Sequence, residues 1–208
     1  MARSTREAIL TAAAELMRHK GYGALGMKDI AEAAGAPIGS LYHHFRGGKV
    51  QIAREALVNA GAAYALLIPT IIDEHTDLGE AIEAVYAQAA EDMAGTGFAN
   101  MCPVGTVAAE VADTVEELRE TSASVIEAWV AGGTAYFVGR GLDEAQARDV
   151  TLAIVGALEG AFILARTLRS TEPLLAAGRA LAPQYRGTRL TAQPDPERVL
   201  PGGVGFPR

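Results

Sequence analysis

Apolar residues recur at intervals of three or four along most of the chain, which is the spacing of amphipathic helices. In the first such stretch, residues 5–19, one helix face would carry Ile9, Ala12, Ala13, Leu16 and Met17. Similar stripes predict helices over residues 49–69, 78–93, 104–111, 114–138 and 143–168, and a short helix after Pro173. No stretch alternates polar and apolar residues as a strand would, so the sequence predicts an all-α fold.

Residues that start or stop helices set the expected boundaries. Asp77 and Asp143 each precede an apolar stripe and are suited to cap a helix N-terminus. Asp113 or Thr114 should begin the helix between them, and Pro69 should end or kink the long helix that Lys49 opens.

Residues 27–45 carry a second signal, two short helices joined by a tight turn. Gly35 permits the positive φ angle that a sharp reversal needs, and Pro37 suits the first position of a new helix. Leu41 and Phe45, four positions apart, should anchor the second helix to a core. Small, polar and aromatic residues then remain on the free face, as in a helix that lies in the major groove of DNA.

The residues expected to contact DNA surround this second helix. We expect Lys28 and Lys49 to hold phosphates, helped by Tyr42, His43 and the N-terminal arm, and Ser40, Ile38 and Gly39 to approach base edges. The full predicted interface is Lys28, Pro37, Ile38, Gly39, Ser40, Tyr42, His43, His44 and Lys49.

Several motifs resemble those of the TetR family of one-component repressors. The matching stretches are Arg6-Glu-Ala-Ile-Leu-Thr-Ala-Ala-Ala-Glu-Leu16, Gly21-Tyr22, Asp29-Ile-Ala31, Ala34-Gly35 and Gly39-Ser-Leu-Tyr-His-His-Phe45. Residues 39–49 and Met101-Cys-Pro-Val-Gly-Thr-Val-Ala-Ala-Glu110 resemble the LmrA/YxaF-type branch, which is linked to drug-resistance and flavonoid-responsive regulation. The resemblance implies a helix-turn-helix domain over residues 1–55 and a ligand-binding and dimerisation domain over residues 56–185.

Two positions depart from the family pattern. Gly26 stands where relatives often carry a capping Ser or Thr, and Ile38 where many carry Lys or Arg. Both changes bear on the operator sequence, and they lend some support to an alternative function, a small-molecule-binding protein with a degenerate DNA-binding head.

Charge is divided unevenly along the chain. Residues 1–54 hold eight basic and four acidic side chains, a net charge of +4, whereas the whole chain carries −7. A basic head on an acidic body favours contact with phosphates at one end only.

Composition indicates the cellular compartment in which the protein is expected to work. The single cysteine excludes an internal disulfide and fits a reducing cytoplasm, and the N-terminus has no secretory signal. Two apolar stretches, residues 56–72 and 150–165, are expected to be buried helices and not membrane spans. Residues 186–208, rich in Pro, Gly and Arg, are expected to form a disordered tail.

The last long helix is the candidate dimer contact. Gly156 and Gly160 lie four apart with Ala153 and Ala157 nearby, which would allow two helices to approach closely in a homodimer. The alternative is that these glycines serve packing within one subunit.

Large or soft side chains suggest a pocket for a flat, apolar effector. The candidates are Tyr64, Leu67, Tyr86, Met93, Phe98, Met101, Cys102, Val107, Glu110, Trp129, Tyr136, Phe137, Glu159 and Phe162. For any single one of them ordinary core packing is favoured over a ligand contact. Glu110 and Glu159 lie in apolar helical surroundings, where a buried carboxylate needs a ligand amine or hydroxyl, an Arg or a backbone donor as partner.

No other constellation points to chemistry. The sequence has no P-loop, dinucleotide-binding glycine pattern, HExxH or GxSxG motif, so we predict no cofactor, no metal and no enzymatic activity. An enzyme using Glu110 or Glu159 as a base is the remaining rival. The sequence as a whole predicts a cytoplasmic, dimeric repressor that binds double-stranded operator DNA and is released by a small effector.

Overall fold

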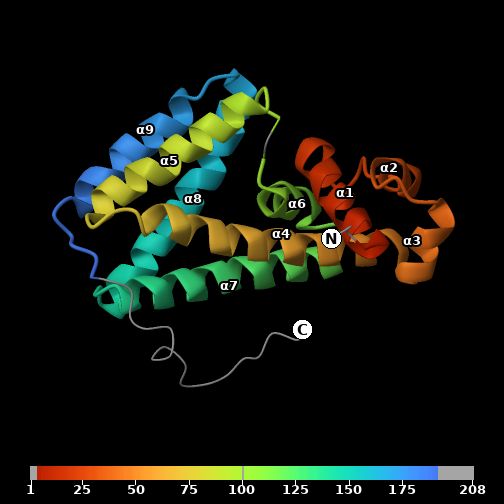
Figure 1. Ribbon diagram of the computed structural model, residues 1–208, viewed down its shortest axis with the longest axis horizontal. Helices are drawn as coiled ribbons and strands as arrows, with labels where there is room; N and C mark the ends of the chain where they lie inside the picture. Colours follow the sequence, from red (N-terminus) through yellow and green to blue (C-terminus); the bar gives the residue numbers. More distant parts are fainter. Residues whose placement is uncertain (1–3, 100, 192–208) are drawn as a thin grey trace.

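The computed structural model describes residues 4–99 and 101–191, and these residues form nine α-helices and one short 3₁₀ helix (Figure 1). The helices are α1 (Thr5–Lys20), α2 (Met27–Ala33), α3 (Ile38–His44), α4 (Gly48–Ile72), α5 (Leu78–Gly95), α6 (Pro103–Val111), α7 (Glu116–Gly139), α8 (Glu144–Leu168) and α9 (Glu172–Leu181), followed by η1 (Ala182–Tyr185). The predicted all-α fold is confirmed.

The molecule has a small head and a longer trunk. Helices α1, α2 and α3 form the head at one end, and α4 runs from the head along α7 into the trunk (Figure 1). Helices α5 and α9 pack together at the far end, with α8 crossing between them and α7. The predicted domain boundary at residue 55 falls inside α4, so the two parts share a helix.

Two apolar cores follow this division. One joins the head to α6 and the start of α7 and includes Ile30, Leu41 and Phe45 of the head beside Val107 and Leu118. The other lies among α5, α7, α8 and α9. The first core therefore crosses from head to trunk and packs α6 against the helices of the head.

Most predicted helix ends are confirmed. Asp77 and Asp143 cap α5 and α8 by accepting hydrogen bonds from the backbone amides of Glu80 and Gln146, at 3.0 and 2.9 Å. Gly26 precedes α2 without a side-chain cap, as its lack of a side chain requires. The expected start of α7 at residue 113 or 114 was wrong, since the helix begins at Glu116.

Pro69 does not end α4. The helix continues through Pro69 to Ile72, although proline has no N–H for the carbonyl of Ala65. Tertiary contacts hold the last turn: Ile72 is fully buried, and the following Asp73 pairs with Arg140 of the loop after α7.

Part of the predicted disordered tail is ordered. Residues 186–191 run beside the loop before α5, where the amide of Leu190 donates to the Thr76 carbonyl at 2.8 Å and the amide of Leu78 donates to the Thr188 carbonyl at 3.0 Å. Leu190 is buried in the trunk core, so this segment gains apolar burial that its composition did not suggest. The rest of the predicted tail, residues 192–208, lies outside the described residues.

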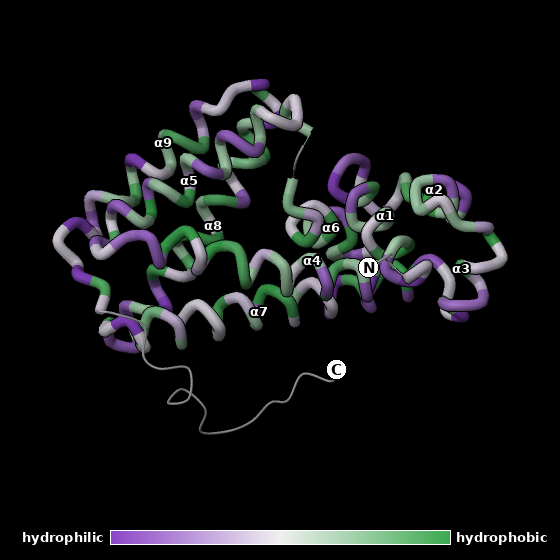
Figure 2. The backbone as a smooth tube through the Cα atoms, viewed as in Figure 1, coloured by the Kyte–Doolittle hydropathy of each residue, from purple (hydrophilic) through white to green (hydrophobic). Residues whose placement is uncertain are grey.

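The two apolar stretches expected to be buried are only partly so. Helices α4 and α8 are long and apolar enough to span a membrane, yet only 28% and 33% of their most apolar windows are buried in the single chain. Leu66 of α4 is 74% exposed, and Leu152, Ile163 and Leu168 of α8 are also exposed. Figure 2 shows apolar segments on both helices.

Candidate DNA interface and effector pocket

Most of the predicted DNA contacts are exposed on the head. Lys28 and the residues of the second helix, Pro37, Ile38, Gly39, Tyr42, His43 and His44, are exposed, and Ser40 is half-buried. Leu41 and Phe45 are fully buried, as predicted, so the opposite face of α3 anchors the helix to the head core. Arg6 lies over the Phe45 ring and pairs with Glu55, which fixes α1 against α3 and α4.

Lys49 contacts the head itself. Its ammonium is 4.1 Å from the centre of the Tyr22 ring and 3.4 Å from the carbonyl oxygen of Gly23. Burial lowers the pKa of Lys49, while the nearby Glu110 carboxylate acts in the opposite direction. Lys49 therefore packs against the loop between α1 and α2, and Lys28 is the more accessible of the two predicted phosphate ligands.

Glu110 joins the trunk to this same loop. Its two carboxylate oxygens accept hydrogen bonds from the backbone amides of Tyr22 and Gly23, both at 2.7 Å. Glu110 is exposed, so its expected place in a buried pocket was wrong. Of the partners considered for it, backbone donors are the ones observed, and the carboxylate serves a contact between head and trunk.

Arg166 of α8 makes a second contact between trunk and head, one that the sequence did not indicate. Its guanidinium donates to the carbonyl oxygens of Arg18 and His19 at 3.1 and 2.7 Å. These carbonyls end α1 and carry the negative end of its dipole, which favours a cation. The last turn of α1 and the following loop are thus held from both α6 and α8.

The trunk contains a cavity of about 200 Å³ among α4, α7, α8 and the start of α6. Seven predicted pocket residues line it: Tyr64, Cys102, Trp129, Tyr136, Phe137, Glu159 and Phe162. Sequence reasoning missed the smaller and aliphatic part of the lining: Ala65, Ile68, Pro69, Ile72, Ala128, Gly132, Gly133, Thr151, Ile154, Val155 and Leu158.

The other predicted pocket residues lie elsewhere. Tyr86 and Met93 are buried in the trunk core, where the Tyr86 hydroxyl donates to the Ile154 carbonyl at 3.1 Å. Phe98 and Met101 pack against the same core, and Val107 is buried between α6 and the head. Leu67 is on the exposed side of α4. These residues therefore lie in a core or on the surface, and they do not line the cavity.

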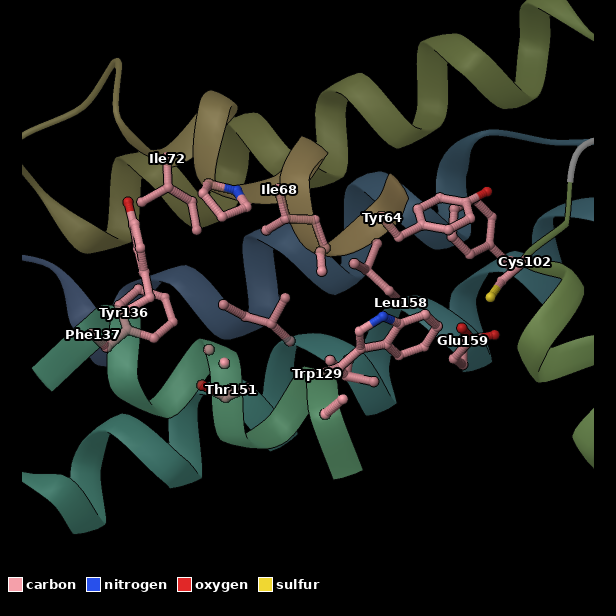
Figure 3. A pocket seen from close by; sticks show the side chains of 18 residues that line it. Tyr64, Ile68, Ile72, Cys102, Trp129, Tyr136, Phe137, Thr151, Leu158 and Glu159 are labelled. Carbon is pink, nitrogen blue, oxygen red and sulfur yellow. The ribbon is translucent and has the colours of Figure 1, made fainter. Parts of the chain in front are cut away.

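The two ends of the cavity differ in chemistry (Figure 3). At one end the Tyr136 hydroxyl donates to Asp73 at 2.6 Å, and Arg140 pairs with the same carboxylate. At the other end the Cys102 thiol hydrogen-bonds the Glu159 carboxylate. Glu159 is thus the acidic group of an otherwise apolar lining.

Burial shapes the ionisation of this second end. It raises the pKa of Glu159 and that of the Cys102 thiol, and it raises the pKa of Tyr64 to about 12. The thiol is therefore protonated at neutral pH, which makes Cys102 a poor nucleophile.

Glu159 also contacts α6, the helix whose Glu110 binds the loop of the head. Its carboxylate lies directly against the α-carbon of Gly105, where even one added carbon would overlap it. Cys102 caps the same helix by accepting from the Gly105 amide at 3.4 Å. The first turn of α6 thus borders the cavity, while its last turn carries Glu110.

An exposed recognition helix in a three-helix head, on a helical trunk, defines a helix-turn-helix transcriptional regulator. Residues 9–56 match the family described as bacterial regulatory proteins, tetR family, and residues 79–180 match the C-terminal domain of LmrA/YxaF-like transcriptional regulators. The chain therefore belongs to the TetR family, with a trunk of the LmrA/YxaF-like type.

Relatives agree over most of the chain. The uncharacterized HTH-type transcriptional regulator YxaF of Bacillus subtilis is 34% identical over 82% of this chain and 90% of its own length. The HTH-type transcriptional regulator LmrA of the same organism is 32% identical, over 82% and 91%. Both are named as transcriptional regulators.

Solved structures share the fold. A TetR transcriptional regulator from Chloroflexus aurantiacus is 29% identical, with a TM-score of 0.68 over 90% of this chain and 97% of that one. The regulatory protein TetR from Rhodobacter sphaeroides superposes with a TM-score of 0.74 at 24% identity, over 86% and 97%.

Proposed function

We propose that this protein is a cytoplasmic, ligand-responsive repressor that binds a near-palindromic operator as a homodimer. A small apolar or aromatic effector, bound in the trunk cavity, would release it from DNA. Membership of the TetR family gives the general function, regulation of transcription. The contacts of α6 and α8 support the more specific proposal of a dimeric repressor that an effector controls.

The continuity of α6 carries the ligand-responsive part of this proposal. Its first turn borders the cavity through Cys102 and Gly105, and its last turn holds the head through Glu110. An effector that displaces the Glu159 side chain would disturb one end of a nine-residue helix whose other end grips the α1–α2 loop. The effector could thereby tilt the head and change the distance between two heads on DNA.

The exposed face of α8 supports a dimer. Leu152, Gly156, Gly160 and Ile163 follow a helical spacing and are exposed. A side-chain carbon added at either glycine would meet no described atom within 4 Å, which argues against the alternative that these glycines serve packing within one subunit. A second copy would bury this apolar face and bring two α8 helices close together.

A dimer would give the head its affinity for a two-part site. Two copies of α3 would enter successive major grooves about 34–36 Å apart, or at a multiple of that spacing. To reverse occupancy from nearly full to nearly empty, an effector must favour the non-binding state by about 10⁴-fold, or roughly 5.5 kcal/mol. The burial of apolar ligand surface in this cavity could supply a free energy of that size.

Titration of duplex DNA with the protein, in the presence of a panel of small aromatic compounds, tests this function. We expect tight, salt-sensitive binding that one class of compound weakens. DNA binding that no cavity ligand changes would contradict the effector part. Ligand binding without any DNA binding would instead identify the alternative, a small-molecule-binding protein with a degenerate head.

A further inference from the structure

We infer that the cavity selects a compact aromatic amine, whose ammonium group pairs with Glu159 while its ring lies among the aromatic side chains. This inference rests on the proposed function, because it names the chemical class of the effector.

The size of the cavity sets the first limit. A cavity of about 150 Å³ lined by aliphatic and aromatic side chains holds a benzene molecule. At about 200 Å³, this cavity accommodates a single ring with a short side chain. A larger polycyclic compound would extend beyond this volume.

Charge sets the second limit. Among the described residues that line the cavity, Glu159 is the carboxylate and there is no Lys, Arg or His. An anionic ligand would therefore meet a like charge with no cation to compensate it. An ammonium group would give the half-buried Glu159 carboxylate a charged partner beside the Cys102 thiol, which is only a weak hydrogen-bond donor.

The hydrogen-bonding groups of the lining point the same way. The donors at Trp129, Thr151 and Tyr136 are already bound to protein acceptors, namely the carbonyls of Gly61 and Ala147 and the carboxylate of Asp73. The Tyr64 hydroxyl, which can donate or accept, and the Glu159 carboxylate, which accepts, are the side-chain groups of the described lining that suit a ligand donating several hydrogen bonds.

The aromatic rings favour a cation at the same end of the cavity. Tyr64 and Trp129 form an edge-to-face pair with ring centres 6.4 Å apart. Figure 3 shows both rings at the end where Glu159 and Cys102 lie. Ring faces attract a desolvated ammonium ion, so the carboxylate and the rings would act together on the same ligand group.

Binding of an amine here would also reach α6. The Glu159 carboxylate rests against Gly105 and accepts from Cys102, so a new ionic partner would compete with both contacts. Glu159 would thus both select the amine and pass the effect of its binding to α6.

Three ligands of similar size test the inference on the full-length protein: 3-phenylpropylamine, 3-phenylpropan-1-ol and 3-phenylpropanoate. Trp129 is the single tryptophan of the chain and lines the cavity, so its fluorescence reports binding directly. We expect the amine to bind at least about tenfold more tightly than the alcohol, the difference between a charge-assisted and a neutral hydrogen bond, and the carboxylate to bind weakest. An alcohol that binds as well as the amine, or a carboxylate that binds best, would overturn the inference.

The variant Glu159→Gln provides a second test. It should remove the advantage of the amine over the alcohol, while the matched control Glu127→Gln, at an exposed position of α7, should keep it. An unchanged amine affinity in Glu159→Gln would also overturn the inference. A bound amine that leaves DNA binding unchanged would contradict the proposed function and leave the ligand class standing. Failure of the amine to bind, while another compound releases DNA, would do the reverse.

Discussion

The Glu110 carboxylate accepts a hydrogen bond of 2.7 Å from the backbone amide of Gly23, although 87 positions separate the two residues. A second oxygen of the same carboxylate accepts from Tyr22, so α6 holds the loop between α1 and α2 at two adjacent amides. This contact crosses from the trunk to the DNA-binding head. In the proposed function it is one of the contacts through which a ligand in the cavity would act on the head.

Glu110→Gln should loosen this connection. The amide keeps one acceptor oxygen and loses the charge, which would weaken the contact by about 1 kcal/mol. We expect faster hydrogen exchange at residues 21–23 and a severalfold weaker effect of a cavity ligand on DNA binding. Glu91→Gln, an exposed position of α5, is the control, and equal exchange in the two variants would contradict the role of Glu110.

Lys28 and Lys49 should contribute differently to DNA binding. Lys28 is exposed, so Lys28→Ala should reduce the slope of log affinity against log salt by about one. The Lys49 ammonium is occupied by Tyr22 and Gly23, so Lys49→Ala should lower the stability of the head and change the slope less. Anisotropy titrations at several salt concentrations measure both slopes. A larger slope change for Lys49→Ala would show that Lys49 turns outward to a phosphate.

Ile163→Asp should separate the proposed dimer. A carboxylate on the exposed apolar face of α8 would be buried without a partner in the interface, at a cost of several kcal/mol. Sedimentation at micromolar concentration should then give a folded single subunit. Leu66→Asp places the same charge on the exposed side of α4 and should leave the dimer intact. If Leu66→Asp gave single subunits and Ile163→Asp did not, the interface would lie on α4.

Gly61→Ala should destabilise the trunk by about 1–3 kcal/mol, because the added carbon would overlap a methyl group of Val125 where α4 meets α7. Val125→Ala removes that methyl group, so the double variant should recover part of the loss. Urea unfolding of the four proteins measures the coupling. Additive effects of the two substitutions would show that the helices do not meet closely here.

Glu159→Gln should make stability depend less on pH. Burial raises the pKa of Glu159 in the folded state above its ordinary value of 4.5, so ionisation destabilises the native protein as pH rises through the ordinary range. The variant should therefore unfold at a higher temperature than the wild type at neutral pH, and the two should converge below the ordinary carboxyl range.

Few other titratable groups near Glu159 could cause this pH dependence of stability. Cys102 and Tyr64 face it from α6 and α4, and both have pKa values raised by burial. Glu15 and Arg18 of α1 act on Tyr64. Glu127→Gln is again the matched control. A midpoint difference that grows toward low pH would contradict the assignment.

Local sequence pattern was enough to predict most of the fold. Capping residues such as Asp77 and Asp143 act on the next turn of the chain, so their effect can be read directly from sequence. Distant contacts decide where α4 ends and how residues 186–191 lie. Arg140 holds the end of α4 beyond Pro69, and the core around Leu190 holds the segment that was wrongly expected to be disordered.

The site was harder to predict for the same reason. The aromatic residues of the lining could be proposed from their residue type alone. Tyr86 and Trp129 are both aromatic residues in apolar helices, yet Tyr86 lies in the core and Trp129 lines the cavity. The small residues Ala128 and Gly132 line the cavity without any chemical signal. Arg166 and Glu110 act on backbone atoms more than 80 positions away, which no local pattern reveals.

Ligand-controlled binding of operator DNA by two subunits is best tested by an anisotropy titration of a labelled duplex taken from the region upstream of this protein's own gene. We expect tight binding by two subunits per site that weakens steeply with salt, and release of the DNA when a ligand fills the cavity, as followed by the fluorescence of Trp129. A protein that ignores this and other duplex DNA at low salt, or that stays bound when the cavity is filled, would contradict it.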